Sequence, residues 1–142
     1  MKKIWPLLLL LLAAPVVSIT GSAAPAAPVG PPDFAVTEIF IKQDKFIHVK
    51  LQNLSAFDVP IQPELKEEIF LTIYIDDIKR TEYKLKYLDQ KLFIKRSTIF
   101  FRTNFRVQKG LHLKIKIQLN PLKCINENNF LNNTMEKTLL GT

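Results

Sequence analysis

Residues 99–119 read IFFRTNFRVQKGLHLKIKIQL, and the regular alternation of apolar and polar side chains in this stretch decides the fold class. Such period-two alternation predicts β-strands that bury one face, and the Lys109-Gly110 pair between them predicts a turn. We therefore expect two strands whose inward side chains are residues 99, 101, 103, 105 and 107, and 111, 113, 115, 117 and 119. Phe100, Arg102, Asn104, Arg106, His112, Lys114, Lys116 and Gln118 should point outward.

The same period recurs along the rest of the chain. Further strands are expected over residues 34–42, 46–52, 69–75, 79–88 and 134–140. Pro60 and Pro63 exclude a regular ladder between the second and third of these. Seven short strands without an amphipathic helix or a repeat predict an all-β fold, a seven-stranded antiparallel immunoglobulin-like β-sandwich. An open barrel is the structural alternative.

The chain of 142 residues has the length of one domain behind an export signal. Residues 1–23 have the pattern of a signal peptide, with Lys2 and Lys3 ahead of an apolar run over residues 4–19. An uncleaved anchor is the alternative, for which this run is short. Residues 24–32 are rich in Ala and Pro and predict a disordered linker. We expect one folded domain over residues 33–140, secreted or periplasmic in the cell envelope, without a stable membrane span after signal cleavage.

Three segments, in this order, resemble one family. Residues 32–39 (PDFAVTEI), followed by 49–53 (VKLQN), are similar to the opening of the CARDB domain, the cell-adhesion-related domain found in bacteria. Residues 73–77 (IYIDD) match its hairpin, and residues 120–133 (NPLKCINENNFLNN) resemble its closing loop. The resemblance covers Pro32 to about Leu140. It implies an immunoglobulin-like sandwich found in exported bacterial and archaeal proteins, generally without catalysis.

The sequence also departs from that family's pattern. Asp77 replaces the hairpin glycine, and in the closing loop Asn120, Lys123 and Phe130 replace an Asp, an Asn and an acidic residue. The loop is therefore less acidic, which argues against cation binding there. We expect Ile125 to plug the end of the sandwich, and the loop's asparagines to hold its backbone geometry.

Basic residues are concentrated in one part of the chain. Residues 33–78 hold nine acidic and four basic residues, whereas residues 79–123 hold thirteen basic and two acidic ones. Such asymmetry concerns partners and solubility rather than fold. We expect a cationic outer face formed by Arg102, Arg106, Lys114 and Lys116, with Asn126 and Asn128 of the closing loop contributing. The alternative is a solvated face that prevents edge-to-edge aggregation.

Catalytic, metal and cofactor sites are not expected. His48 and His112 fall at outward positions of different strands, and no acidic calcium loop or nucleophile elbow is present. Adjacent carboxylates such as Glu67-Glu68 point to opposite faces of an extended chain. The single cysteine, Cys124, is a candidate for a disulfide between two chains, or else a half-buried small hydrophobe.

We therefore expect an exported, non-catalytic binding or adhesion module of the bacterial cell envelope. Its partner would be a protein, an anionic glycan or an anionic envelope polymer, and not nucleic acid. The alternative is a structural envelope subunit that forms a homo-oligomer, with the acidic first half of one copy meeting the basic second half of the next. An enzyme accessory or inhibitor domain has the same sequence features as a binding module.

Overall fold

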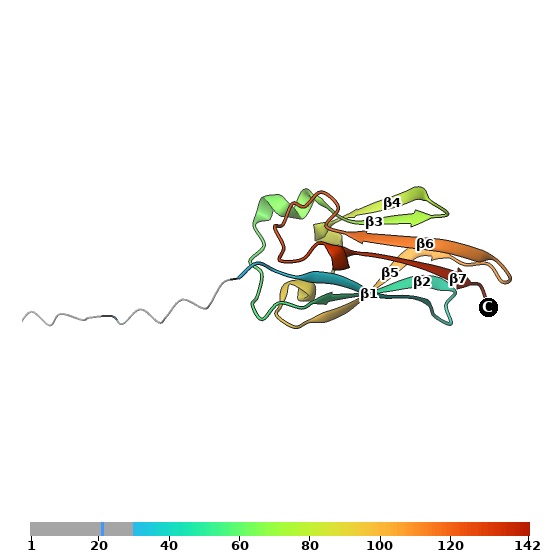
Figure 1. The fold of residues 1–142 in the computed structure, drawn as a ribbon, viewed down its shortest axis with the longest axis horizontal. Helices are drawn as coiled ribbons and strands as arrows, with labels where there is room; N and C mark the ends of the chain where they lie inside the picture. Colours follow the sequence, from blue (N-terminus) through green and yellow to red (C-terminus); the bar gives the residue numbers. More distant parts are fainter. Residues whose placement is uncertain (1–20, 22–29) are drawn as a thin grey trace, which may run out of the picture.

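Two antiparallel β-sheets lie face to face and form the protein (Figure 1). The computed structural model describes Gly21 and residues 30–142. Apart from Gly21, the predicted signal peptide over residues 1–23 and the predicted linker up to residue 29 lie outside the described residues. In the described part of the chain, no helix is long and apolar enough to cross a membrane.

The smaller sheet has the strand order β1-β2-β5 and the larger one the order β4-β3-β6-β7. The strands are β1 (Phe34–Ile41), β2 (Phe46–Asn53), β3 (Ile69–Ile75), β4 (Ile78–Lys84), β5 (Thr98–Arg106), β6 (His112–Leu119) and β7 (Thr134–Leu140). Short 3-10 helices occupy the connections: η1 (Pro63–Glu67), η2 (Leu85–Tyr87), η3 (Gln90–Phe93) and η4 (Leu131–Asn133). The predicted seven-stranded antiparallel sandwich is confirmed.

The turn after β5 carries the chain from one sheet to the other. β5 pairs with β2 in the smaller sheet, whereas β6 pairs with β3 and β7 in the larger one. Two strands that are neighbours in the sequence therefore belong to opposite layers of the sandwich. Their outward side chains consequently point to opposite sides of the molecule.

One predicted strand is shorter than expected. The strand predicted over residues 79–88 ends at Lys84, because the chain then bends into η2 and buries Leu85. Asp76 and Asp77 form the predicted turn before it, both with positive φ (49° and 63°).

The core consists of the inward rows of both sheets. Ile47, Val49, Leu51, Ile115 and Ile117 have no exposed surface, as the alternation predicts. The inward prediction is wrong for Leu111, which is 46% exposed because it lies in the turn ahead of β6.

Aromatic rings fill one end of the core. The ring of Phe34 makes edge contacts with those of Phe70 and Phe93, with centroids 5.6 and 5.3 Å apart. Ile125 of the closing loop is buried in the same continuous core and plugs it as expected.

A buried carboxylate fixes the closing loop to the first strand. Glu127 is 6% exposed, and its Oε2 accepts a hydrogen bond from the backbone N–H of Phe34 at 2.8 Å. Its Oε1 accepts from Asn120 Nδ2 at 2.5 Å and from Asn133 Nδ2 at 2.7 Å. Three donors thus compensate the burial of one charged group. Sequence reasoning missed this residue, since a glutamate in a loop normally faces solvent.

The folded unit extends slightly beyond its predicted limits. Pro32, predicted as part of the disordered linker, is buried, and its carbonyl accepts a hydrogen bond from the N–H of Asn128 at 2.8 Å. At the other end, the N–H of Gly141 donates to the carbonyl of Leu111 at 2.9 Å. Backbone pairing, rather than composition, sets both boundaries.

A buried and a half-exposed aliphatic side chain of residues 99–119, Ile117 and Leu111, allow a stability test. Ile117→Ala should lower the free energy of unfolding by about 2–5 kcal/mol, because it leaves a cavity in a closed core. Leu111→Ala should cost less than about 1 kcal/mol, since half of its surface already contacts water. Urea unfolding of both variants measures the difference, and equal losses would contradict the inward and outward assignment.

Glu127→Gln tests the buried carboxylate. One oxygen becomes an NH2 group that faces an N–H donor, so the free energy of unfolding should fall by about 1–3 kcal/mol. Burial raises the pKa of Glu127 above its usual 4.5. This group therefore favours folding most below that pH, and the contribution is lost as the pH rises through the folded-state pKa. The stability difference between wild type and variant should narrow as the pH rises from 4.5 through the folded-state pKa, and a difference that widens would contradict the raised pKa.

Candidate functional site

The four basic residues predicted to share one face lie on two opposite faces. Arg102 and Arg106 belong to β5, and Lys114 and Lys116 to β6 of the other sheet. We call the outer surface of β1-β2-β5 the three-strand face and that of β4-β3-β6-β7 the four-strand face. The structure thus corrects the expectation of a single cationic face, because alternation does not say to which sheet a strand belongs.

On the four-strand face, the cations are matched by groups of the chain itself. Lys114 Nζ lies 3.0 Å from Asp77 Oδ1 and 3.4 Å from Glu136 Oε1. Hydrogen bonds to Asp77 and then Glu136 raise the pKa of Lys114. Lys116 Nζ lies 4.9 Å from the centre of the Tyr74 ring. Of the two lysines predicted for the site, Lys114 is thus paired with carboxylates, whereas Lys116 contacts only a ring.

The three-strand face combines cations with aromatic rings. The guanidinium of Arg102 lies 3.8 Å from the centre of the Phe46 ring, and its Nε lies 3.3 Å from Asp44 Oδ2. Lys42 Nζ lies 5.6 Å from the centre of the Phe100 ring, which is 58% exposed. Aromatic rings and arginines are residue types enriched at binding surfaces, and this face presents both.

His48 connects the aromatic and charged residues of the three-strand face. It was predicted to be exposed, but it is only 6% exposed because the Phe40 ring stacks on it at 5.7 Å. Its Nε2 donates to Asp44 Oδ2 at 3.0 Å. Burial acts to raise the pKa of Asp44, yet the hydrogen bonds from His48 and the Phe46 N–H and the nearby charges lower it overall. Asp44 therefore stays ionised and positions both His48 and Arg102.

The closing-loop asparagines lie far from these cations. Asn126 and Asn128 have exposed side chains, and the N–H of Asn128 donates to Pro32. Their loop lies at the end of the sandwich where the described chain begins, whereas Arg106 ends β5 at the opposite end (Figure 1). The structure does not bring them into one site with Arg102 and Arg106.

Cys124 is half-buried against the core, and its thiol donates to Asn120 Oδ1 at 3.2 Å. Burial, and to a smaller degree the charge of Glu68, raises the pKa of this thiol. Little thiolate is therefore present at neutral pH, which slows oxidation. A disulfide between two chains stays a prediction.

Metal-ligating side chains do not gather in the described part of the chain. Among Gly21 and residues 30–142, no group of three or more His, Cys, Asp or Glu side chains has the arrangement to hold a metal ion. His48 and Asp44 contact each other, but Arg102 pairs with the same carboxylate.

Comparison with known proteins yields a match in fold only. No family model and no curated protein matches the sequence. Among solved structures, the chain is similar to the CARDB domain of a protein from Pyrococcus furiosus, crystallised in complex with di-metal ions. The TM-score is 0.56 at 15% sequence identity, and the match covers 80% of this chain and 96% of that one. The resemblance seen in the sequence motifs is confirmed at the level of architecture: this chain has the immunoglobulin-like sandwich fold of a CARDB domain.

Proposed function

We propose that this protein is an exported, non-catalytic binding module of the bacterial cell envelope. Its three-strand face would contact an anionic partner, either a glycan, an envelope polymer or an acidic protein surface. The observation that carries the proposal is the exposed Phe100 ring, bordered by Lys42 and in the same outward row as Arg102.

The chemistry of that face suits a charged partner with an apolar side. An exposed phenyl ring gains from covering by a flat apolar surface such as a sugar ring or an aliphatic side chain. Lys42, which pairs with no Asp or Glu among the described residues, would then meet a negative group of the partner, and Arg102, already paired with Asp44, would add a weaker contact in the same footprint. Because Asp44 and His48 fix Arg102 from one side, little conformational entropy is lost when a ligand binds to it.

Export is inferred from the sequence alone. Lys2 and Lys3 ahead of the uncharged apolar stretch over residues 4–19 favour recognition by secretory machinery. A secreted or periplasmic location agrees with the extracellular use that the CARDB name implies. We carry no metal site over from the Pyrococcus domain, since the described residues of the present chain offer no matching group of ligands.

Self-assembly through opposite charges is the less favoured function. It would need the acidic first half of the chain to be available to another copy. Three of the nine carboxylates of residues 33–78 are instead used within the chain. Asp44 pairs with Arg102, and Asp77 pairs with Lys114. Glu67 is likewise used within the chain, by Lys84 and Lys86.

Charge reversal on each face in turn tests the proposal. Arg102→Glu/Arg106→Glu and Lys114→Glu/Lys116→Glu change the net charge equally, but on opposite faces. With polygalacturonate or dextran sulfate as the immobilised probe, the first variant should bind at least about 10-fold more weakly and the second within about 2-fold of wild type.

Binding by wild type should weaken steeply as salt rises from about 50 to 500 mM, because exposed charges are screened over about 10 Å or less. Circular dichroism verifies that both variants are folded. Equal losses in the two variants, or binding that is insensitive to salt, would sink the assignment to the three-strand face.

A further inference from the structure

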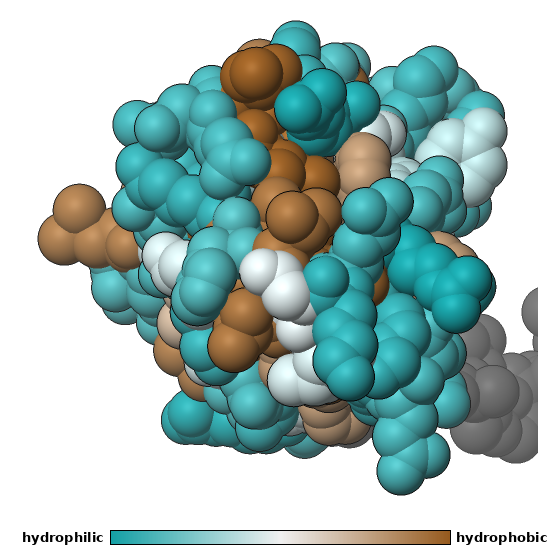
Figure 2. Space-filling view, turned by 90° about the vertical axis from the view of Figure 1, so that its right-hand side faces the viewer, coloured by the Kyte–Doolittle hydropathy of each residue, from teal (hydrophilic) through white to brown (hydrophobic). Residues whose placement is uncertain are grey.

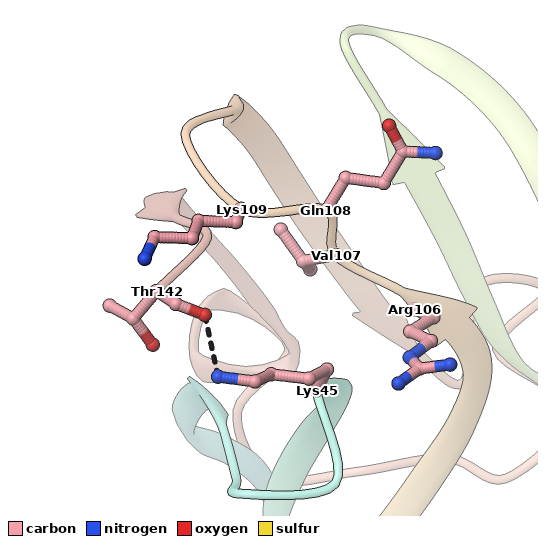
Figure 3. A pocket seen from close by; sticks show the side chains of 6 residues that line it. All are labelled: Lys45, Arg106, Val107, Gln108, Lys109 and Thr142. Atoms are coloured by element: carbon pink, nitrogen blue, oxygen red, sulfur yellow. Dashed lines mark hydrogen bonds between the residues drawn. The ribbon is translucent and has the colours of Figure 1, made fainter.

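A hollow of about 530 Å³ lies at the end of the sandwich that carries the last residue of the chain (Figure 3). Figure 2 looks onto this end and shows apolar side chains in its middle, framed by hydrophilic ones. Several turns meet here, and the hollow is lined by Lys45, Arg106, Val107, Gln108, Lys109 and Thr142.

The backbone around the hollow is tightly tied. The N–H of Val107 donates to the carbonyl of Lys45 at 2.8 Å, which joins the β5–β6 turn to the β1–β2 turn. The N–H of Gly110 donates to the carbonyl of Gly141 at 2.8 Å. A Cβ at Gly141 would lie 1.9 Å from the carbonyl oxygen of Gln108, so only glycine permits this approach. The hollow is thus preformed by backbone contacts between three segments.

Three cations border this hollow, together with the terminal carboxyl group of Thr142, the last residue of the printed sequence, and no Asp or Glu side chain lines it. Lys45, Arg106 and Lys109 come from two different turns and the end of β5. Among the described residues none of the three pairs with an Asp or Glu side chain, although Arg102 and Lys114, on the flanking faces, both do. Lys45 Nζ donates to the main-chain oxygen of Thr142 at 2.6 Å, so this terminal group offsets part of the Lys45 charge and leaves Arg106 and Lys109 for another anion. Like charges held around one space repel one another, and a bound anion would relieve that repulsion.

The side chains suit an oxyanion. The planar guanidinium of Arg106 can donate two parallel hydrogen bonds to a carboxylate, sulfate or phosphate group. Lys45 and Lys109 would add point charges, and Gln108 an amide. The hollow is larger than an oxyanion alone and falls within the size range of small-molecule sites. The group that fills it should therefore carry a ring or chain as well as a charge.

We propose that this hollow binds an oxyanion carried on a sugar unit, and that it anchors the charged group of the partner that lies along the three-strand face. The oxyanion site follows from the hollow itself, whereas its link to a longer polymer rests on the proposed function. Arg106, at the end of β5, belongs to both surfaces and makes them continuous.

Titration of the protein with inorganic phosphate, inorganic sulfate and galacturonate, at constant ionic strength, tests the site by NMR. Backbone amides of the turns over residues 43–46 and 106–111 should shift in a saturable way. If galacturonate binds more tightly than both inorganic ions, the oxyanion is the carboxylate of a sugar acid. If phosphate or sulfate binds more tightly, the oxyanion is a phosphate or sulfate ester of a sugar. Neutral galactose should produce no shift. Equal shifts with chloride in place of all three anions would overturn the proposal.

Lys45→Gln/Lys109→Gln removes two charges from the hollow and spares Arg106. Its affinity for the best of the three anions should fall at least about 10-fold. Lys91→Gln/Lys95→Gln removes two charges from the opposite end and should bind within about 2-fold of wild type. Should the first pair fail to fold, Arg106→Lys keeps the charge and loses the planar fork, so its affinity should fall several-fold. Wild-type affinity in the Gln pair or in Arg106→Lys overturns the site.

Polygalacturonate binding separates this inference from the proposed function. If Lys45→Gln/Lys109→Gln loses the monosaccharide and the polymer together, the anchoring role is supported. If that variant keeps full polymer affinity while Arg102→Glu loses it, the anchoring role is overturned and the three-strand face still stands. If wild type binds galacturonate in the hollow but no anionic polymer, the oxyanion site stands and the proposed function fails.

Discussion

A strand in a two-layer sandwich gives only one of its two rows of side chains to the core, and every surface feature of this protein depends on that constraint. Ile115 and Ile117 fill the core from β6, so Lys114 and Lys116 must point away from it. Arg102 is fixed in the same way on β5, but in the other sheet. The intersheet turn therefore separates two pairs of cations that are only eight residues apart in the sequence, and each pair has a different electrostatic environment.

The alternation makes the strands and the core predictable, and it fails where the chain leaves a sheet. Leu111 fits the inward period, yet the turn ahead of β6 has no facing layer to bury it. The same limit applies to the candidate site: period two places Arg102 and Lys114 outward, but sheet membership depends on pairing partners elsewhere in the chain. His48 shows the converse case, an outward residue that is buried by the ring of Phe40, its register partner on the adjacent strand β1.

Long-range polar contacts are the part that sequence reasoning could not supply. Glu127 is tolerated in the interior because Phe34, 93 residues away, offers its N–H, and nothing local marks that contact. From the sequence alone, the opposite charges of the two halves of the chain suggest that copies of the protein assemble with one another. In the fold, Asp44, Glu67 and Asp77 of the acidic half form ion pairs with basic residues of the second half of the same chain. Such pairs are exposed and stabilise little, but they remove charge from the surfaces that they occupy.

The cations that pair with no Asp or Glu side chain therefore matter most for binding. A protein gains solubility from scattered lysines, and scattered lysines need no common orientation. Lys45, Arg106 and Lys109 are not scattered, because backbone hydrogen bonds and the close approach at Gly141 hold their segments around one hollow. Holding like charges together costs free energy that separated positions would avoid. Within the hollow only the terminal carboxyl group of Thr142 offsets these charges, so a further bound anion would stabilise the arrangement.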